Sequence, residues 1–223
     1  MSDTNKVRFG LKNVHYALLT EESGTVTYGE PVAWPGAKSI TLDPEGDTST
    51  YYADDMAYYS TNSNNGYTGT LEMSYLPEDV KKAIFNNITT KDGLLAEDAN
   101  ELPSNVALMF EFSGDKKATK HIFYRVVFAR PSIEGETKED TVDPKTTSMD
   151  ITCIPVEKDG HAWVKADCFS GTSLYDTFYT TTPTLPTATD ASTVSDDTTK
   201  KAVVDSTDDT TSTTDDGTEV ITY

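Results

Sequence analysis

A period of two in the apolar side chains constrains the fold more than any other feature of this sequence. Along residues 67–75 one face of the pattern is apolar or glycine, and the other carries Thr68, Thr70, Glu72 and Ser74. The same alternation returns in residues 106–113, 120–129 and 146–153, and in 120–129 it puts Ile122, Tyr124, Val126 and Phe128 on one face. Successive side chains of a strand point to opposite faces, so each segment predicts a half-buried strand. We expect a mainly β protein with a β-sandwich or barrel-like core.

One flanking α-helix is predicted directly after the strand at 67–75. Pro77 opens it at a position where a missing N–H costs nothing. Glu78 and Asp79 then occupy the first turn, where the helix dipole favours negative charge. The helix presents an apolar stripe made of Val80, Ala83 and Ile84.

The segment at 43–65 shows no periodicity and predicts a long loop that closes at Gly66. Loops of this length are usually functional or disordered. Tyrosine offers large, rigid contact area at low entropic cost, which suits a surface that meets a partner. The candidate contact residues are Tyr51, Tyr52, Asp54, Asp55, Met56, Tyr58 and Tyr59. Alternatively, the tyrosines could fold back over the edge of their own core.

The polar faces of two predicted strands are candidates for a second surface. They consist of Thr68, Thr70, Glu72 and Ser74 on one strand, and of Thr146, Ser148, Asp150 and Thr152 on the other. Either face alone could be the ordinary wet face of a sheet. Together, being mildly acidic and almost free of lysine and arginine, they fit a sheet that lines an aqueous passage for a polyanion.

Composition narrows the class of partner. The chain of 223 residues has 37 acidic and 18 basic residues and a net charge of −19. This charge argues against a protein that binds nucleic acid through its phosphates. No apolar run approaches the about 20 residues of a membrane span. The N-terminal residues lack the apolar core of a secretion signal, so we expect a cytosolic product. Cys153 and Cys168 are then expected to be free thiols.

Motifs for catalysis and metal binding are weak. Asp43, Glu45 and Asp47 alternate as in a calcium loop, but Thr48 stands where such a loop needs glycine. The three histidines, His15, His121 and His161, have no partner at ligand spacing. Neither a nucleophile elbow nor a phosphate-binding glycine pattern is present. We therefore predict a protein that is not an enzyme and has no catalytic residues, cofactor or metal site.

The composition changes along the chain and suggests three parts. Residues 1–12 predict a polar N-terminal arm, and residues 13–182 contain the predicted strands and helix. Thr, Asp and Ser dominate residues 183–223, which predicts an acidic, disordered C-terminal extension.

Three runs of the sequence point to one family. They are VRFGLKNVHYALLT at 7–20, the tyrosine- and asparagine-rich run at 52–69 with the strand and helix after it, and FARPSIEGETKEDTVDPKTTSMDITCIPV at 128–156. Together they resemble the major tail proteins of long-tailed phages (siphoviruses) of Gram-positive bacteria. The resemblance covers roughly residues 5–180 and excludes the Asp/Thr-rich extension.

This resemblance implies a structural virion protein with the phage tail-tube fold, whose hexameric rings stack into the tube that conducts DNA from capsid to host. The loop at 43–65 would then contact the next ring, and the two polar faces would line the lumen. The implied partners are further copies of the chain and the tape-measure, tail-terminator and distal-tail proteins, with DNA passing without sticking. Such proteins are late products that assemble in the host cytoplasm and end in the virion, with no membrane anchor.

Two other interpretations remain open at this stage. A surface adhesin or fibre domain could use the tyrosines as a stacking platform for a host saccharide. The tube or sheath of a phage-derived bacteriocin would share the same subunit physics.

Overall fold

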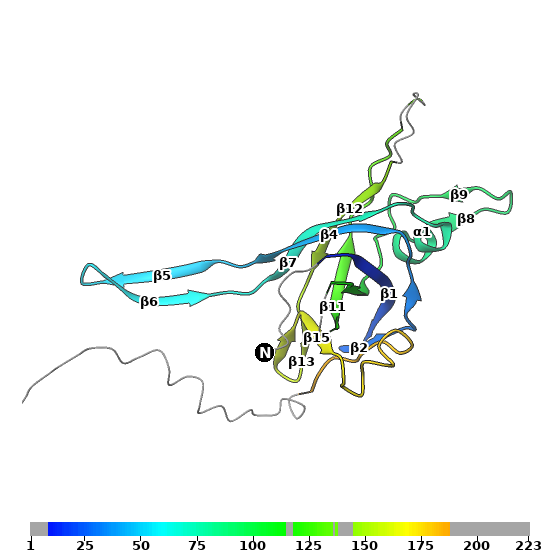
Figure 1. Cartoon of the computed structure of the whole chain (residues 1–223). Helices are drawn as coiled ribbons and strands as arrows, with labels where there is room; N and C mark the ends of the chain where they lie inside the picture. The colour runs from blue at the N-terminus through cyan, green and yellow to red at the C-terminus, as the bar shows by residue number, and fades with distance from the viewer. Residues whose placement is uncertain (1–8, 115–117, 136, 138–144, 188–223) are drawn as a thin grey trace, which may run out of the picture. The chain divides into compact units, whose positions relative to one another are not determined.

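The computed structural model of the chain describes residues 9–114, 118–135, 137 and 145–187 (Figure 1). This part is mainly β, with a large antiparallel sheet and one short helix, as the alternation predicts. The sheet contains β1 (Leu11–Glu22), β2 (Thr25–Tyr28), β3 (Val32–Ala33), β4 (Ala37–Glu45), β7 (Gly66–Met73), β10 (Val106–Phe112), β11 (Thr119–Phe128), β12 (Thr147–Cys153) and β15 (Lys165–Phe169). Three further ribbons pair β5 (Thr48–Ala53) with β6 (Met56–Asn62), β8 (Ile88–Thr89) with β9 (Leu95–Ala96), and β13 (Val156–Lys158) with β14 (His161–Trp163).

The strands of the sheet follow the order β2-β1-β10-β11-β12-β7-β4, with β3 added to β1 and β15 added to β11. β4 stands at one end of this order and also contacts β1, so the sheet curves back towards itself. The connection between β3 and β4 follows this seam, where the Trp34 N–H donates to the Val14 carbonyl at 2.8 Å. No described helix is both long enough and apolar enough to cross a membrane.

The main core lies between the sheet and α1 (Glu78–Phe85). Val80, Ile84 and Phe85 of the helix are buried against it, as the predicted stripe requires. Pro77 is the N-cap residue rather than the first helical residue, a difference of one position. Trp34 is fully buried beside Phe128, with ring centroids 5.8 Å apart. Each such burial contributes about 1.5–3 kcal/mol, so these side chains hold helix and sheet together.

A second, smaller core covers the other face of β10 and β11. Met109, Ile122 and Tyr124 pack there against Phe178 and Leu185 from the C-terminal segment. The prediction that Ile122, Tyr124, Val126 and Phe128 share one face is wrong, because Val126 and Phe128 belong to the main core. The pairing of β10 with β11 is irregular between Val106 and Leu108. One extra residue in a strand reverses the faces beyond it.

The predicted limits of the β domain need two corrections. Leu11 and Lys12, assigned to the N-terminal arm, begin β1 and pair with β10. Leu185, assigned to the C-terminal extension, is buried, and its carbonyl accepts from Lys158 Nζ at 2.9 Å. The packed part therefore continues at least to Leu185. Residues 1–8 of the predicted arm and 188–223 of the predicted extension lie outside the described residues.

The prediction of an unstructured loop over 43–65 is wrong. β4 continues to Glu45, and β5 and β6 then form an antiparallel hairpin (Figure 1). Asp54 and Asp55 make its two-residue turn with φ of 52° and 60°, the left-handed conformation that tight hairpin turns require and that aspartate tolerates. Every residue of β6 is exposed, so this strand has no buried face and leaves no period of two in the sequence.

Candidate interaction surfaces

The β5–β6 hairpin is joined to the sheet by a short neck that continues the strand pairing. The Ser63 N–H donates to the Asp47 carbonyl at 3.0 Å, and the Asn65 N–H donates to the Glu45 carbonyl at 2.8 Å. A Cβ added at Gly46 would lie 2.0 Å from the Ser63 carbonyl oxygen, so the two backbones approach closely only because glycine stands there. The hairpin is thus a hydrogen-bonded extension of β4 and β7.

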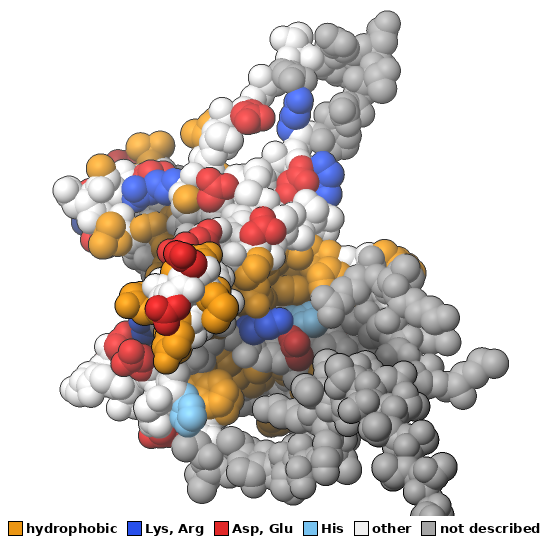
Figure 2. All heavy atoms as spheres, turned by 90° about the vertical axis from the view of Figure 1, so that its left-hand side faces the viewer, with side chains coloured by type: hydrophobic (Ala, Val, Ile, Leu, Met, Phe, Trp, Pro, Cys, Tyr) orange, Lys and Arg blue, Asp and Glu red, His pale blue; other side chains and the backbone are white. Residues whose placement is uncertain are grey.

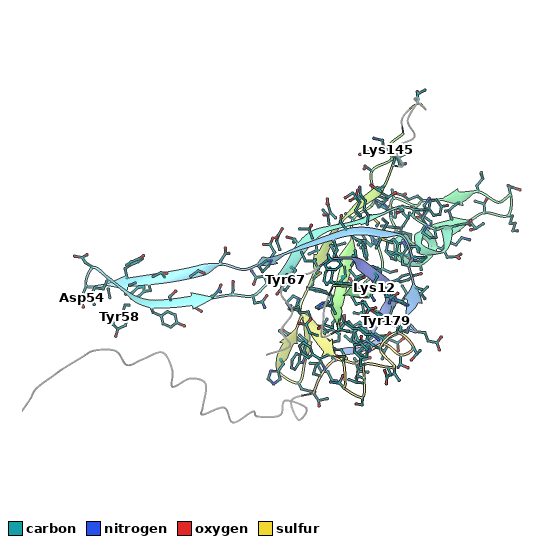
Figure 3. The ribbon with its side chains drawn as sticks, in the orientation of Figure 1. Lys12, Asp54, Tyr58, Tyr67, Lys145 and Tyr179 are labelled. Carbon is teal, nitrogen blue, oxygen red and sulfur yellow. The ribbon has the colours of Figure 1, made fainter. Side chains whose placement is uncertain are left out.

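The hairpin exposes its large side chains to solvent. Tyr51, Tyr52, Met56, Tyr58 and Tyr59 are each 62–75% exposed, which contradicts the alternative that the tyrosines fold back over the core. Figure 3 labels Asp54 and Tyr58 towards the far end of the hairpin and Tyr67 at its base. Seen from the hairpin side, hydrophobic and acidic side chains lie together on the nearest part of the molecule (Figure 2).

The exposed area on the hairpin is large for a two-stranded ribbon. A tyrosine can bury about 150–250 Å², so four that are about two-thirds exposed leave about 400–650 Å² of aromatic surface in contact with water. The largest apolar patch of a typical monomer is about 300–600 Å² and is often functional. An isolated two-stranded hairpin is also marginally stable in water. The size of this exposed aromatic area, on a ribbon whose β6 strand has no buried residue, makes the hairpin a candidate interaction surface.

The two predicted polar faces lie side by side in the structure. Thr68, Thr70 and Glu72 of β7 stand opposite Thr152, Asp150 and Ser148 of β12. Directly opposite residues point to the same face of a sheet, so these six residues form one surface. Ser74 and Thr146 lie just beyond the ends of the two strands.

β4 extends this surface with three residues that the sequence analysis did not include. Asp43, Thr41 and Ser39 stand opposite Thr68, Thr70 and Glu72. The signal was present, because Ile40 and Leu42 alternate with these polar residues and pack against the core. We call the nine residues the polar face: Ser39, Thr41, Asp43, Thr68, Thr70, Glu72, Ser148, Asp150 and Thr152.

Glu72 is the most strongly bound carboxylate of the polar face. Lys38 Nζ lies 2.7 Å from Glu72 Oε1, Ser39 Oγ donates to Glu72 Oε2 at 2.9 Å, and Thr146 Oγ1 also donates to Glu72. These hydrogen bonds, with Lys38 first, lower the pKa of Glu72 from 4.5 to about 2. The polar face therefore keeps this negative charge in all but strongly acidic solution.

Asp43, Glu45 and Asp47, which alternate as in a calcium loop, are spread along the end of β4 and the neck of the hairpin. Glu45 Oε1 accepts a hydrogen bond from Thr68 Oγ1 at 2.7 Å, and the Asp47 carbonyl belongs to the neck. Within the described ranges, no three His, Cys, Asp or Glu side chains come together as a metal site would need. Cys153 is buried, and burial raises the pKa of its thiol to about 12.

A buried polar cluster joins the sheet to the C-terminal segment, and the sequence analysis missed it. Lys120 is only 9% exposed, and its Nζ donates to the Tyr175 carbonyl at 2.7 Å. The same Nζ lies 4.0 Å from the ring centroid of Tyr175 and 4.6 Å from that of Tyr179. Burial raises the pKa of Tyr179, and nearby Glu111 adds to the effect. The available signal was weak, because Lys120 shares its strand with His121 and Arg125.

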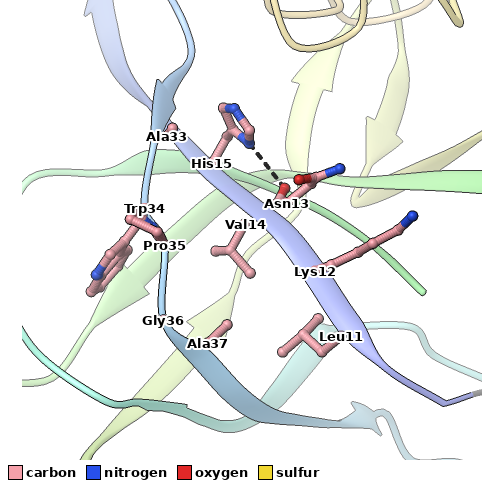
Figure 4. Close-up of a pocket in the computed structure, with 10 residues that line it drawn as sticks. All are labelled: Leu11, Lys12, Asn13, Val14, His15, Ala33, Trp34, Pro35, Gly36 and Ala37. Atoms are coloured by element: carbon pink, nitrogen blue, oxygen red, sulfur yellow. Dashed lines mark hydrogen bonds between the residues drawn. The ribbon is translucent and has the colours of Figure 1, made fainter. Parts of the chain in front are cut away.

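A cavity of about 280 Å³ lies at the seam between β1 and the β3–β4 connection (Figure 4). Its walls are the 11–15 segment of β1 and the 33–37 segment that contains Trp34. His15 Nδ1 lies 2.9 Å from the Asn13 carbonyl oxygen, and its ring stacks on Tyr179 with centroids 4.4 Å apart. His15 is thus part of the packing around the seam.

The chain matches no protein-family model and no curated protein sequence.

Proposed function

We propose that this protein is the major tail protein of a long-tailed phage, whose copies assemble into hexameric rings that stack into the tail tube. The observation that carries the proposal is the β5–β6 hairpin, which exposes four tyrosines and Met56 on a hydrogen-bonded ribbon. Such a surface supports contact with another protein chain, and a further copy of the same chain is the partner that a tube requires.

The sheet supports the proposal in a second way. β4 pairs along one edge with β7, and no described strand is hydrogen-bonded to its other edge, although β4 also contacts β1. An open edge can pair with a strand of another chain. Edge-to-edge pairing of six copies would join their polar faces into one barrel, which is the tail-tube fold that we propose for this sheet.

The chemistry of the polar face suits a channel for DNA. Hydroxyl groups dominate it, and its carboxylates are those of Asp43, Glu72 and Asp150. Lys38 is engaged by Glu72 beside it. DNA phosphates are repelled by such a surface and find few cations to bind, so DNA would pass through without adhering. The tape-measure, tail-terminator and distal-tail proteins would be further partners, with assembly in the host cytoplasm and the virion tail as destination.

The test is negative-stain electron microscopy of the purified protein at high concentration, with sedimentation velocity as a second measurement. We expect rings or hollow tubes with sixfold end views. The double variant Tyr58→Ala, Tyr59→Ala should remain folded by circular dichroism but should not form tubes. Thr61→Ala, an exposed change on the same strand, is the matched control and should assemble normally. Normal tubes from the tyrosine variant would remove the hairpin from the assembly.

The geometry of the tyrosines disfavours the saccharide-binding alternative. Tyr51 and Tyr52 are consecutive in β5 and point to opposite faces of the ribbon. Tyr59 stands opposite Tyr51, so the rings are divided between two faces. Saccharide binding by stacking needs rings that share one face. A glycan-binding screen that found a specific sugar for a protein that stays monomeric would favour the adhesin over the tube subunit.

A further inference from the structure

A groove beside α1 lies at the opposite end of the β4–β7 ladder from the hairpin. The ladder runs from the pair Glu45–Gly66, where the hairpin begins, to the pair Ala37–Met73, after which the chain enters α1. Figure 1 shows β5 and β6 leaving one end of these strands and α1 lying at the other. The groove has a volume of about 590 Å³. One subunit therefore carries two distinct surfaces at opposite ends of the same two strands.

The groove has a mixed lining with an apolar floor. Leu76 and Phe85 are buried at its base, and Leu95 and Pro131 line it. Ile133 also lines the groove and is fully exposed. The groove thus offers apolar surface that a partner could cover.

The wall of the groove is fixed by hydrogen bonds. Arg130 Nε lies 2.8 Å from Glu97 Oε1, and its Nη2 donates to the carbonyls of Asp98 and Glu101 at 2.9 Å each. Lys81, also on the lining, makes no ion pair within the described part of the chain. Hydrogen bonds therefore hold Arg130 in place at one side of the groove, and Lys81 adds a positive charge to the lining.

The hairpin complements this groove in shape and apolar area, and its charge matches one residue of the lining. Its tip carries Asp54 and Asp55, opposite in sign to Lys81, and its sides carry the exposed tyrosines and Met56. Of the two carboxylates on the lining, Glu97 is paired with Arg130 and Glu134 accepts a hydrogen bond from Ser132. The aromatic surface of about 400–650 Å² amounts to about half to four-fifths of the about 800 Å² that each partner buries in a stable protein–protein interface, and a ribbon that enters a groove can use both of its faces. The ribbon extends about 20 Å beyond the sheet, given six residues at about 3.3 Å each, and so can enter a groove on a neighbour.

We propose that the hairpin of one copy docks into the α1 groove of the next copy. The inference rests on the proposed tube function and adds the surface that receives the hairpin. Because hairpin and groove lie at opposite ends of the β4–β7 ladder, each docking event leaves one free hairpin and one free groove. Such a heterologous contact repeats without closing, so copies or rings add head to tail.

A complementation experiment tests the docking. One protein carries Tyr58→Ser and Tyr59→Ser, which remove two of the four exposed tyrosines of the hairpin but leave the groove. A second carries Lys81→Glu and Ile133→Asp, which block the groove but leave the hairpin. Both pairs of changes are at exposed or half-exposed positions, and circular dichroism checks that each protein folds. Leu174→Asp, at an exposed leucine that does not line the groove, is the matched control.

We expect each double variant alone to raise the concentration needed for tube growth at least about tenfold, which corresponds to about 1.4 kcal/mol per contact. Mixing the two should give a species of about twice the mass of either alone. The intact hairpin of the groove variant docks into the intact groove of the hairpin variant, and the altered surfaces left at the two ends prevent further growth. The Leu174→Asp protein should form tubes as the unaltered protein does.

The failures of the two proposals are distinguishable. Tubes from the groove variant, with none from the hairpin variant, would mean that the hairpin docks elsewhere, and the docking proposal would be overturned while the tube function stands. A defect equal to that of the groove variant in the Leu174→Asp control would also overturn it. An unaltered protein that never associates at any concentration would overturn both.

Discussion

Gly69 shows how closely two strands of the sheet approach one another. It stands in β7 between Leu42 of β4 and Ile151 of β12. A Cβ added there would lie 1.9 Å from the Thr41 carbonyl oxygen and 3.0 Å from the Leu42 Cα. Both are backbone atoms, which cannot rotate away as a side chain would. Any larger residue at position 69 must push β4 off β7, at the strand that bears the hairpin.

We therefore predict that Gly69→Ala lowers the free energy of unfolding by about 1–3 kcal/mol, the usual cost of overpacking. Urea denaturation measures this change in the free energy of unfolding. Gly135→Ala is the matched control, because nothing lies within 4 Å of a Cβ added there. Equal stability of the two variants would show that β4 and β7 have room to separate.

Glu72 gives the polar face a dependence on pH. Its pKa is lowered from 4.5 to about 2 in the folded protein. Above pH 4.5 the carboxylate is charged in folded and unfolded chains alike, so its bonds to Lys38, Thr146 and Ser39 contribute in full. As the pH falls from 4.5 towards 2, the unfolded chain binds the proton first and this contribution is lost.

We predict that the urea midpoint of the unaltered protein falls more steeply over this pH range than that of Glu72→Gln. Glu157→Gln, at an exposed position on β13, should retain the steep fall. A Glu72→Gln protein whose midpoint followed the unaltered protein at every pH would mean that the Lys38 contact is not formed in solution.

Among the elements, the C-terminal segment at 170–187 depends on anchors rather than on strand pairing. Phe178 and Leu185 insert into the second core, and Thr182 Oγ1 donates to the Gly29 carbonyl at 2.7 Å. Lys120 adds a charged hydrogen bond to the Tyr175 carbonyl beneath two tyrosine rings. A charged hydrogen bond of this kind contributes about 1.5–3 kcal/mol.

We predict that Lys120→Met loosens this segment while the rest of the sheet stays folded. Hydrogen exchange of residues 172–182 should become about tenfold to a hundredfold faster, the equivalent of about 1.5–3 kcal/mol. Lys165→Met, on the neighbouring strand β15 and half-exposed, should leave exchange unchanged. Protection that is equal in the two variants would show that the apolar anchors alone hold the segment.

For the whole molecule, the net charge of −19 opposes every contact between copies. One exposed ion pair between copies, such as the one inferred for Lys81, contributes about 0–1 kcal/mol and cannot offset that repulsion. Added salt shortens the Debye length from about 30 Å at 0.01 M to about 8 Å at 0.15 M. Repulsion between copies is screened over this range, whereas apolar contact is not.

We predict that self-association strengthens as sodium chloride rises from about 0.01 to 0.15 M. Light scattering at constant protein concentration measures it, and magnesium chloride at the same ionic strength separates screening from specific cation binding. Association that weakened with salt would mean that ion pairs, rather than the tyrosines, carry the contact.

Alternation of apolar and polar residues was sufficient to locate the strands that bury one face. β7 and β12 were predicted from alternation because a strand between core and solvent must place apolar side chains at every second position. β10 was predicted in the same way, but the structure buries both of its faces rather than one. The sequence also determined which hairpin residues are unusual, since tyrosines and aspartates in a polar context stand out by composition.

How the strands and the hairpin combine depends on contacts that form only in the folded chain. The hairpin at 43–65 has two solvated faces, so no period marks it, and the irregular pairing of β10 with β11 exchanges the faces of β11 without a signal in the sequence. Membership of the polar face depends on register, because Ser39, Thr41 and Asp43 join it only through pairing with β7. Local patterns record whether a side chain is buried, whereas the neighbour that a strand selects is fixed by contacts between residues far apart in the chain.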